Sequence, residues 1–109
     1  MTSIDEVTGL ALEIKRTTEE YVYDFDFSVL MNAGDSIVNV DSISQTKRGN
    51  VTGSADVIFG VPIHDSGNLG QVRISGGTDD EYYCLDMLVS TSSGEKPQCS
   101  GVLWVKDAC

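Results

Sequence analysis

A stretch of alternating side chains, residues 69–105, constrains the fold of this chain more than any other feature. It holds three runs of β-forming residues separated by two glycine-bearing turns. Successive side chains of a strand point to opposite faces, so residues two apart share a face. In the middle run one face is formed by Tyr83, Leu85, Met87 and Val89. The other face carries Cys84, Asp86 and Leu88. The pattern predicts β-structure with one buried face, which should also receive Leu103, Val105, Tyr23 and Phe25.

Two turns divide this stretch. Gly76 and Gly77 precede an acidic gap, and paired glycines accept the positive φ values of a tight reversal. The second turn, Ser93-Gly94, is expected to be a two-residue hairpin loop. That register would place Cys84 opposite Leu103 and Cys99 opposite Leu88.

Further strands are predicted upstream. Residues 21–27 alternate strictly and place aromatic rings on one face: Tyr21, Tyr23, Phe25 and Phe27. Residues 36–45 change the parity of their apolar positions, which indicates a strand with a bulge or a change of face. Residues 55–61 form an apolar strand that Pro62 should end. About seven short strands in one chain of this length predict an all-β, two-sheet antiparallel sandwich.

The first 20 residues are expected to form an N-terminal arm, and residues 21–109 the sandwich domain. Ser3 and Glu6 fit a helix capping box, with a stripe formed by Ile4, Val7, Ala11 and Ile14. Leu10, Leu12 and Ile14 instead alternate with Glu13 and Lys15. An extended arm whose second half is a strand is favoured, because Gly9 disfavours a helix. It is either a first strand of the sandwich or an arm lying on a neighbouring subunit.

The motif Ser75-Gly76-Gly77-Thr78, followed by an acidic gap, a strand opened by tyrosine and a Ser92-Ser93-Gly94 turn, resembles a family of small tailed-phage virion proteins. The upstream run Tyr23-Asp24-Phe25-Asp26-Phe27, with Gly34-Asp35 after it, resembles the opening of the same family. The resemblance covers roughly residues 21–106. It implies an immunoglobulin-like domain of the neck, collar, fibre or capsid surface. The arm, the Pro62-Ile63-His64-Asp65 segment and the three cysteines depart from the pattern.

Charge limits the partners. Lys and Arg number 7 against 17 Asp and Glu, a formal net charge of −10. This negative charge argues against binding of nucleic acid, because contacts with phosphates need cationic side chains. It suits an exposed surface that binds a basic partner. No apolar run approaches the roughly 20 residues of a membrane span, and the N-terminus does not read as a signal peptide. The chain is expected to be made in the host cytoplasm and to reside in the virion.

No catalytic, metal or cofactor site is predicted. His64 is the only histidine, and no Gly-x-Ser-x-Gly elbow accompanies it. The acidic groups Asp79-Asp80-Glu81 and Asp24 with Asp26 lack the spacing of a calcium loop. A zinc site would need His64 and all three cysteines, which contain no C-x-x-C pair.

The three cysteines, Cys84, Cys99 and Cys109, are an odd number, so at least one has no partner within the chain. They are candidates for interchain disulfides, with Cys109 foremost because a terminal residue can reach another chain. Trp104, outward by parity, is a candidate partner contact.

The function expected from these observations is a structural accessory protein of the collar, neck or capsid surface of a tailed phage, present as a homo-oligomer or as a multi-copy assembly. It would bind other virion proteins and perform no reaction. A host-surface or glycan-binding module is the alternative, with Trp104 as the stacking platform.

Overall fold

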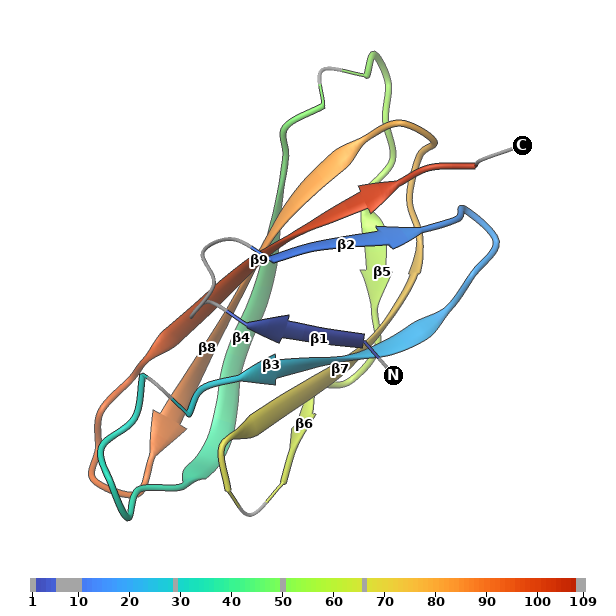
Figure 1. Ribbon diagram of the computed structural model, residues 1–109. Helices are drawn as coiled ribbons and strands as arrows, with labels where there is room; N and C mark the ends of the chain where they lie inside the picture. The colour runs from blue at the N-terminus through green and yellow to red at the C-terminus, as the bar shows by residue number, and fades with distance from the viewer. Residues whose placement is uncertain (1, 6–10, 29, 50, 66, 108–109) are drawn as a thin grey trace.

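The computed structural model describes residues 2–5, 11–28, 30–49, 51–65 and 67–107, with side chains described from residue 14 onward. The described residues form strands and no helix, so none of them belongs to a helix that could cross a membrane. Figure 1 shows the strands β1 (Thr2–Asp5), β2 (Ala11–Lys15), β3 (Tyr21–Asp26), β4 (Ile37–Lys47), β5 (Val57–Phe59), β6 (Ile63–His64), β7 (Leu69–Gly76), β8 (Tyr82–Thr91) and β9 (Gln98–Val105).

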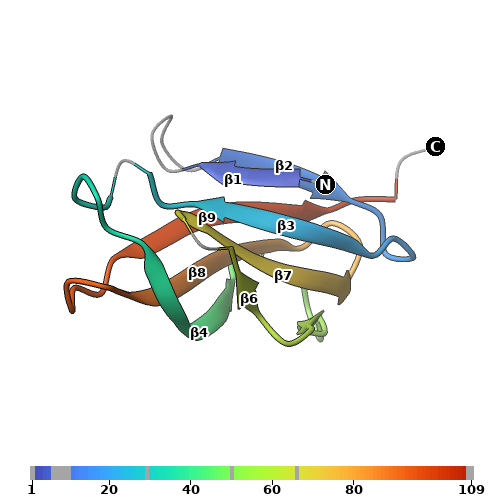
Figure 2. The same cartoon turned by 90° about the horizontal axis from the view of Figure 1, so that it is seen from below.

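The strands form two sheets packed as layers, which confirms the all-β, two-sheet prediction. One sheet has the order β1-β3-β7-β5, with β6 also paired to β7, and the other has the order β2-β9-β8-β4. In Figure 2, β3 and β7 lie in one layer and β8 and β9 in the other. The order β3-β7-β5 beside β9-β8-β4 corresponds to strands B-E-D and G-F-C of an immunoglobulin domain. The immunoglobulin-like class itself stays a prediction.

The antiparallel pairing expected for the sandwich is found between β3, β5, β6 and β7 and between β4, β8 and β9, but two edge strands pair differently. β1 runs parallel to β3, and β2 runs parallel to β9. Parallel partners cannot be joined by a tight hairpin, and here each pair joins segments that are apart in the chain. The strand expected in the second half of the arm is confirmed at Ala11–Lys15. The boundary between an arm of residues 1–20 and a domain of residues 21–109 stays a prediction.

The core lies where the alternation places it. All eight residues predicted for the buried face are 0% exposed: Tyr23, Phe25, Tyr83, Leu85, Met87, Val89, Leu103 and Val105. Phe27 is also fully buried, whereas Tyr21, the first residue of β3, is 38% exposed. Apolar burial on this scale, roughly 25 cal/mol per Å² removed from water, is the main force holding the sheets together.

The predicted register of the last hairpin is wrong by one residue. Tyr83 lies opposite Leu103, and Met87 lies opposite Cys99. Residues 92–94 form a three-residue loop, closed by the hydrogen bond from Thr91 N to Glu95 O (2.9 Å). Gly94 alone among these loop residues has a positive φ, +89°. A three-residue loop with one left-handed glycine replaces the two-residue turn, and it moves Cys99 to the core face.

The remaining strands show irregular pairing at the sheet edges. β4 has register shifts at Ile37/Asn39 and Val40/Ser42, which confirms the bulge. The strand predicted over residues 55–61 is shorter, because pairing stops at Phe59 and resumes at Ile63. We call residues 60–62 the edge break. Together with β1 it raises the number of strands above the seven expected.

Candidate functional site

The outer face of the five-stranded sheet carries a cluster of exposed apolar side chains along its β5-β6 edge. Ile58 is 64% exposed, Val61 in the edge break 87%, and Ile63 56%. We call these three residues the edge ridge. Val57 is buried while Ile58 is exposed, as the alternation of a half-buried strand requires. Val61 and Ile63 line one hollow together, and exposed apolar side chains that lie together mark contact surfaces more often than single ones do.

A shallow pocket of about 190 Å³ opens beside the edge ridge. It is lined by Val22, Val61, Ile63, Gln71, Val72 and Arg73. Ile63 pairs with Gln71, and Val22 pairs with Arg73, so side chains of three neighbouring strands meet on one face. The hollow is large enough to receive one or two apolar side chains of a partner.

The charges around this pocket are mainly negative. Arg73 is the only Lys or Arg in β3, β5, β6 and β7. Its Nη1 lies 3.2 Å from Oε2 of Glu20. Asp24 accepts a hydrogen bond from Gln71 Nε2 (2.8 Å), and Asp26 accepts one from Ser28 N (2.9 Å). Three carboxylates therefore stand against one guanidinium on this face.

The outer face of the second sheet holds Trp104, which is half-buried rather than freely exposed. Its ring stacks on Tyr82 with the centroids 5.2 Å apart and the planes 5° apart. Lys106 Nζ lies 6.0 Å from the Trp104 ring centroid and 3.6 Å from Asp80 Oδ1. The Tyr82 ring covers one face of the indole. The role of Trp104 as a partner contact stays a prediction.

Cys84 and Cys99 lie on opposite faces of the second sheet. Cys84 is half-buried on the outer face of β8, opposite Val102. Cys99 is 0% exposed, and its Sγ lies 3.8 Å from Asp26 O. A thiol on the core face cannot reach a second chain while the sandwich is closed, so its burial argues against Cys99 as a cross-linking residue. Cys109 lies outside the described residues.

The acidic groups considered as metal ligands have separate structural roles. Asp79 Oδ1 accepts a hydrogen bond from Asp107 N (2.8 Å), and Asp80 pairs with Lys106. Among the residues whose side chains are described, no three His, Cys, Asp or Glu side chains gather as a metal site would require. His64 Nδ1 contacts the backbone oxygen of Asp65 (2.6 Å) rather than its carboxylate.

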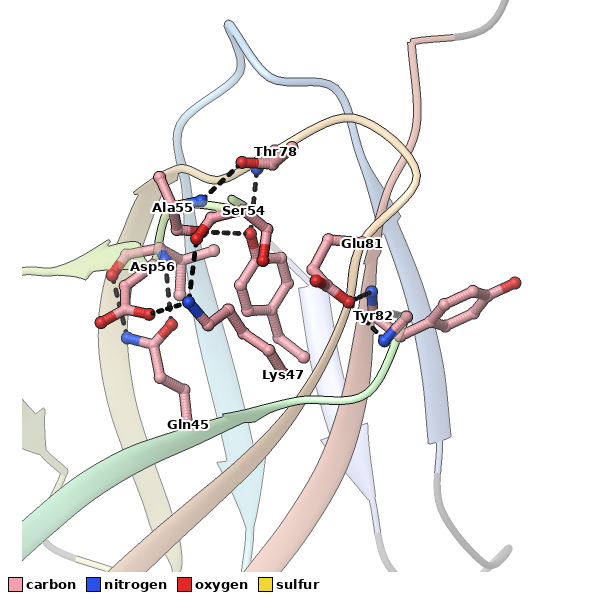
Figure 3. A network of polar contacts seen from close by, with 11 residues as sticks. Gln45, Lys47, Ser54, Ala55, Asp56, Thr78, Glu81 and Tyr82 are labelled. Atoms are coloured by element: carbon pink, nitrogen blue, oxygen red, sulfur yellow. Dashed lines mark hydrogen bonds and ion pairs between the residues drawn. The ribbon is translucent and has the colours of Figure 1, made fainter. Parts of the chain in front are cut away.

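A polar network at one end of the sandwich was not predicted from the sequence. Lys47 Nζ lies 2.9 Å from Ser54 O and 3.3 Å from Asp56 Oδ1, and Ala55 N donates to Thr78 Oγ1 (2.8 Å) (Figure 3). Gln45 and Val57 exchange two hydrogen bonds of 2.9 Å. These bonds tie the loop after β4 to the turn before β8.

Glu81 is the buried carboxylate of this network, at 1% exposure. Burial alone would raise its pKa, but hydrogen bonds from Ser54, Tyr82, Gly49 and Val51 outweigh burial and hold the pKa below its usual value. Side-chain alternation was the sequence signal that could have predicted this burial. Glu81 and Tyr83 are two residues apart and share the inward face.

Lys15 is a second buried charge, and at the end of β2 the apolar residue faces outward and the charged one inward. Ile14 is 58% exposed and Lys15 is 0% exposed. Lys15 Nζ donates to Arg16 O and Gly76 O, both at 2.6 Å. Desolvation lowers the pKa of this ammonium, against the opposing effect of Glu19 and Asp107. Its bond to Gly76 links the edge of one sheet to the end of the other.

Comparison with known families gives one match over most of the chain. Residues 15–103 match the family described as podophage GP4 fiber-tail adaptor protein gp77. The matched span begins at the last residue of β2 and ends within β9. Among curated proteins, none matches the chain.

Proposed function

We propose that this chain, which belongs to the podophage GP4 fiber-tail adaptor protein gp77 family, joins a fibre to the tail of a phage particle. The family match over residues 15–103 is the observation that carries the proposal. It also makes the chain a structural accessory protein of a tailed phage, as the resemblance implied.

The architecture suits a connector. An adaptor must hold two partners at a set distance, and a sandwich with a close-packed core is a stiff spacer between two outer faces. Each sheet here has its own outer face: one carries the edge ridge, and the other carries Trp104 and Tyr82. Two partners can therefore bind without competing for the same surface.

The family match favours a location of this chain at the point where a fibre meets the tail. Collar, neck and capsid-surface positions remain alternatives to this placement. The glycan-binding alternative gains no support from Trp104, because Tyr82 already covers one face of the indole ring. A carbohydrate platform would need that aromatic face open to the sugar.

We also propose that interchain disulfides link this chain to its neighbours in the particle. Cys84 is half-buried on an outer face, and Cys109 is the last residue of the chain. Either thiol becomes able to oxidise once the particle has left the reducing cytoplasm. A cross-link there would hold a subunit even where its contact area is small.

The decisive experiment is deletion of the gene, followed by electron microscopy of the purified particles. An adaptor predicts particles with a complete tail and no fibres, and purified protein should restore fibre binding. Particles that keep their full set of fibres without this chain would contradict the proposal.

A further inference from the structure

We infer that the edge ridge and its pocket bind a basic, apolar segment of another virion protein through side-chain contacts. The inference rests on the proposed adaptor function and assigns one of its two partner surfaces. The partner segment would place an apolar side chain in the pocket and Lys or Arg beside it.

The first step is the exposure of the ridge. Val61 is the most exposed of the large apolar side chains in the described part of the chain, at 87%. It stands beside the pocket that Val22 and Ile63 also line. An apolar side chain seated there would remove these three from water at once. A side chain seated in a desolvated pocket is typical of the centre of a protein interface.

The second step is the shape of the edge, which excludes addition of a partner strand. β5 and β6 are three and two residues long, and the edge break separates them. Gly60 N donates inward to Arg73 O (2.8 Å), and Pro62 has no N–H to offer. Short, broken, proline-bearing edges are how sheets avoid pairing with other chains. The partner must therefore be recognised by side chains on the outer face.

The third step is charge, which selects the partner. Two residues of the pocket contact carboxylates, since Gln71 bonds to Asp24 and Arg73 is already paired with Glu20. Asp26 follows Asp24 by two residues on the same face of β3. A second copy of this chain would bring the same carboxylates and another net charge of −10 against this face. Like charges in an interface oppose binding, whereas Lys and Arg on the partner complement them. The occupant is thus a basic segment of a different protein and not a second copy.

The test uses the purified chain with two preparations, particles of the same phage that lack it and isolated fibres of that phage, and co-sedimentation is the readout. Val61→Asp places a charge on the edge ridge at an exposed position, so the fold should be kept. Val38→Asp is the matched control, since Val38 is 54% exposed on β4 of the other sheet. Thermal unfolding of all variants verifies folding. We expect Val61→Asp to weaken binding by about ten-fold or more and Val38→Asp to leave it unchanged.

A second variant tests the charge of the partner. Asp24→Asn keeps an oxygen that accepts the hydrogen bond of Gln71 but removes the negative charge. We expect weaker binding than wild type at low salt, with the difference lost at high salt because ions screen exposed charges. Equal or tighter binding of Asp24→Asn at low salt would overturn the basic partner.

The remaining outcomes are separable. If Val61→Asp binds as tightly as the wild type, the edge ridge is not the binding surface, but the adaptor function is not contradicted. If the wild type self-associates and Val61→Asp abolishes this self-association, a second copy is the occupant and the inference is overturned. Failure of the wild type to bind deficient particles overturns the proposed function together with it.

Discussion

Gly49 lies directly against Glu81: its backbone N–H donates to the Glu81 carboxylate, and a Cβ at residue 49 would overlap the same oxygen. That Cβ would also lie 2.9 Å from Tyr82 N. Tyr82 N donates to Glu81 Oε1 as well, at 2.9 Å. One buried carboxylate oxygen thus joins the loop after β4 to the start of β8, and only glycine leaves room for it.

Replacing this carboxylate should destabilise the sandwich in a pH-dependent way. Glu81→Gln keeps one acceptor oxygen but loses the charge, and hydrogen bonds to charged groups contribute about 1.5–3 kcal/mol. Because hydrogen bonds hold the pKa of Glu81 below its usual 4.5, its contribution is complete above about pH 4.5 and is lost as the pH falls through the lowered pKa. Urea unfolding of both proteins between neutral and acid pH measures the difference. A difference that stays constant across this range would contradict the assignment.

Truncation of the core should cost far more than truncation of the edge ridge. Phe25 and Leu85 are 0% exposed, and their change to Ala should cost roughly 2–5 kcal/mol because each leaves a cavity. Ile58→Ala, at 64% exposure, is the matched control and should cost about 0.5 kcal/mol or less. Chemical denaturation at one pH compares all three. Small effects at both core positions would mean that the two faces of these strands are reversed.

Lys15 should make the sandwich gain stability in alkali. Desolvation lowers its pKa in the folded protein below the usual 10.5, so the unfolded chain binds its proton more tightly. Stability then rises with pH between the lowered pKa and 10.5. Lys15→Met retains the aliphatic stem and cannot titrate, so the stability of wild type minus that of Lys15→Met should increase over this range. A flat difference would show that the amine is solvated.

Particles prepared without reductant should contain this chain in covalent species of higher mass. Cys109→Ser should diminish them, and Cys84→Ser should do so if the half-buried thiol of β8 takes part. Cys99→Ser is the internal control, because Cys99 is buried on the core face. Mass spectrometry of particles denatured and alkylated without reduction provides the measurement. Complete alkylation of all three thiols there would end the cross-linking hypothesis.

Side-chain alternation in the sequence by itself determined the two faces of β3, β8 and β9. The period of a strand is two residues, so apolar parity is a local property and does not depend on partners. The same parity also contained Cys99 and Glu81, which share the inward face with Leu103 and Tyr83. Side-chain alternation alone therefore predicts that both residues are buried. The assumed two-residue turn argued against burial of Cys99, and the polarity of a carboxylate argued against burial of Glu81.

Only the tertiary structure decided which strands lie side by side and which charges are buried. The parallel pairing of β2 with β9 joins segments some ninety residues apart, since Ala11 lies opposite Gly101. This contact turns Ile14 outward and Lys15 inward, where the Gly76 carbonyl from the other sheet accepts its hydrogen bond. Val61 of the edge ridge likewise lies in the edge break, where pairing with β7 is interrupted. These features depend on residues that are far apart in the sequence. Their hydrogen bonds offset the cost of desolvation only when the two sheets pack together.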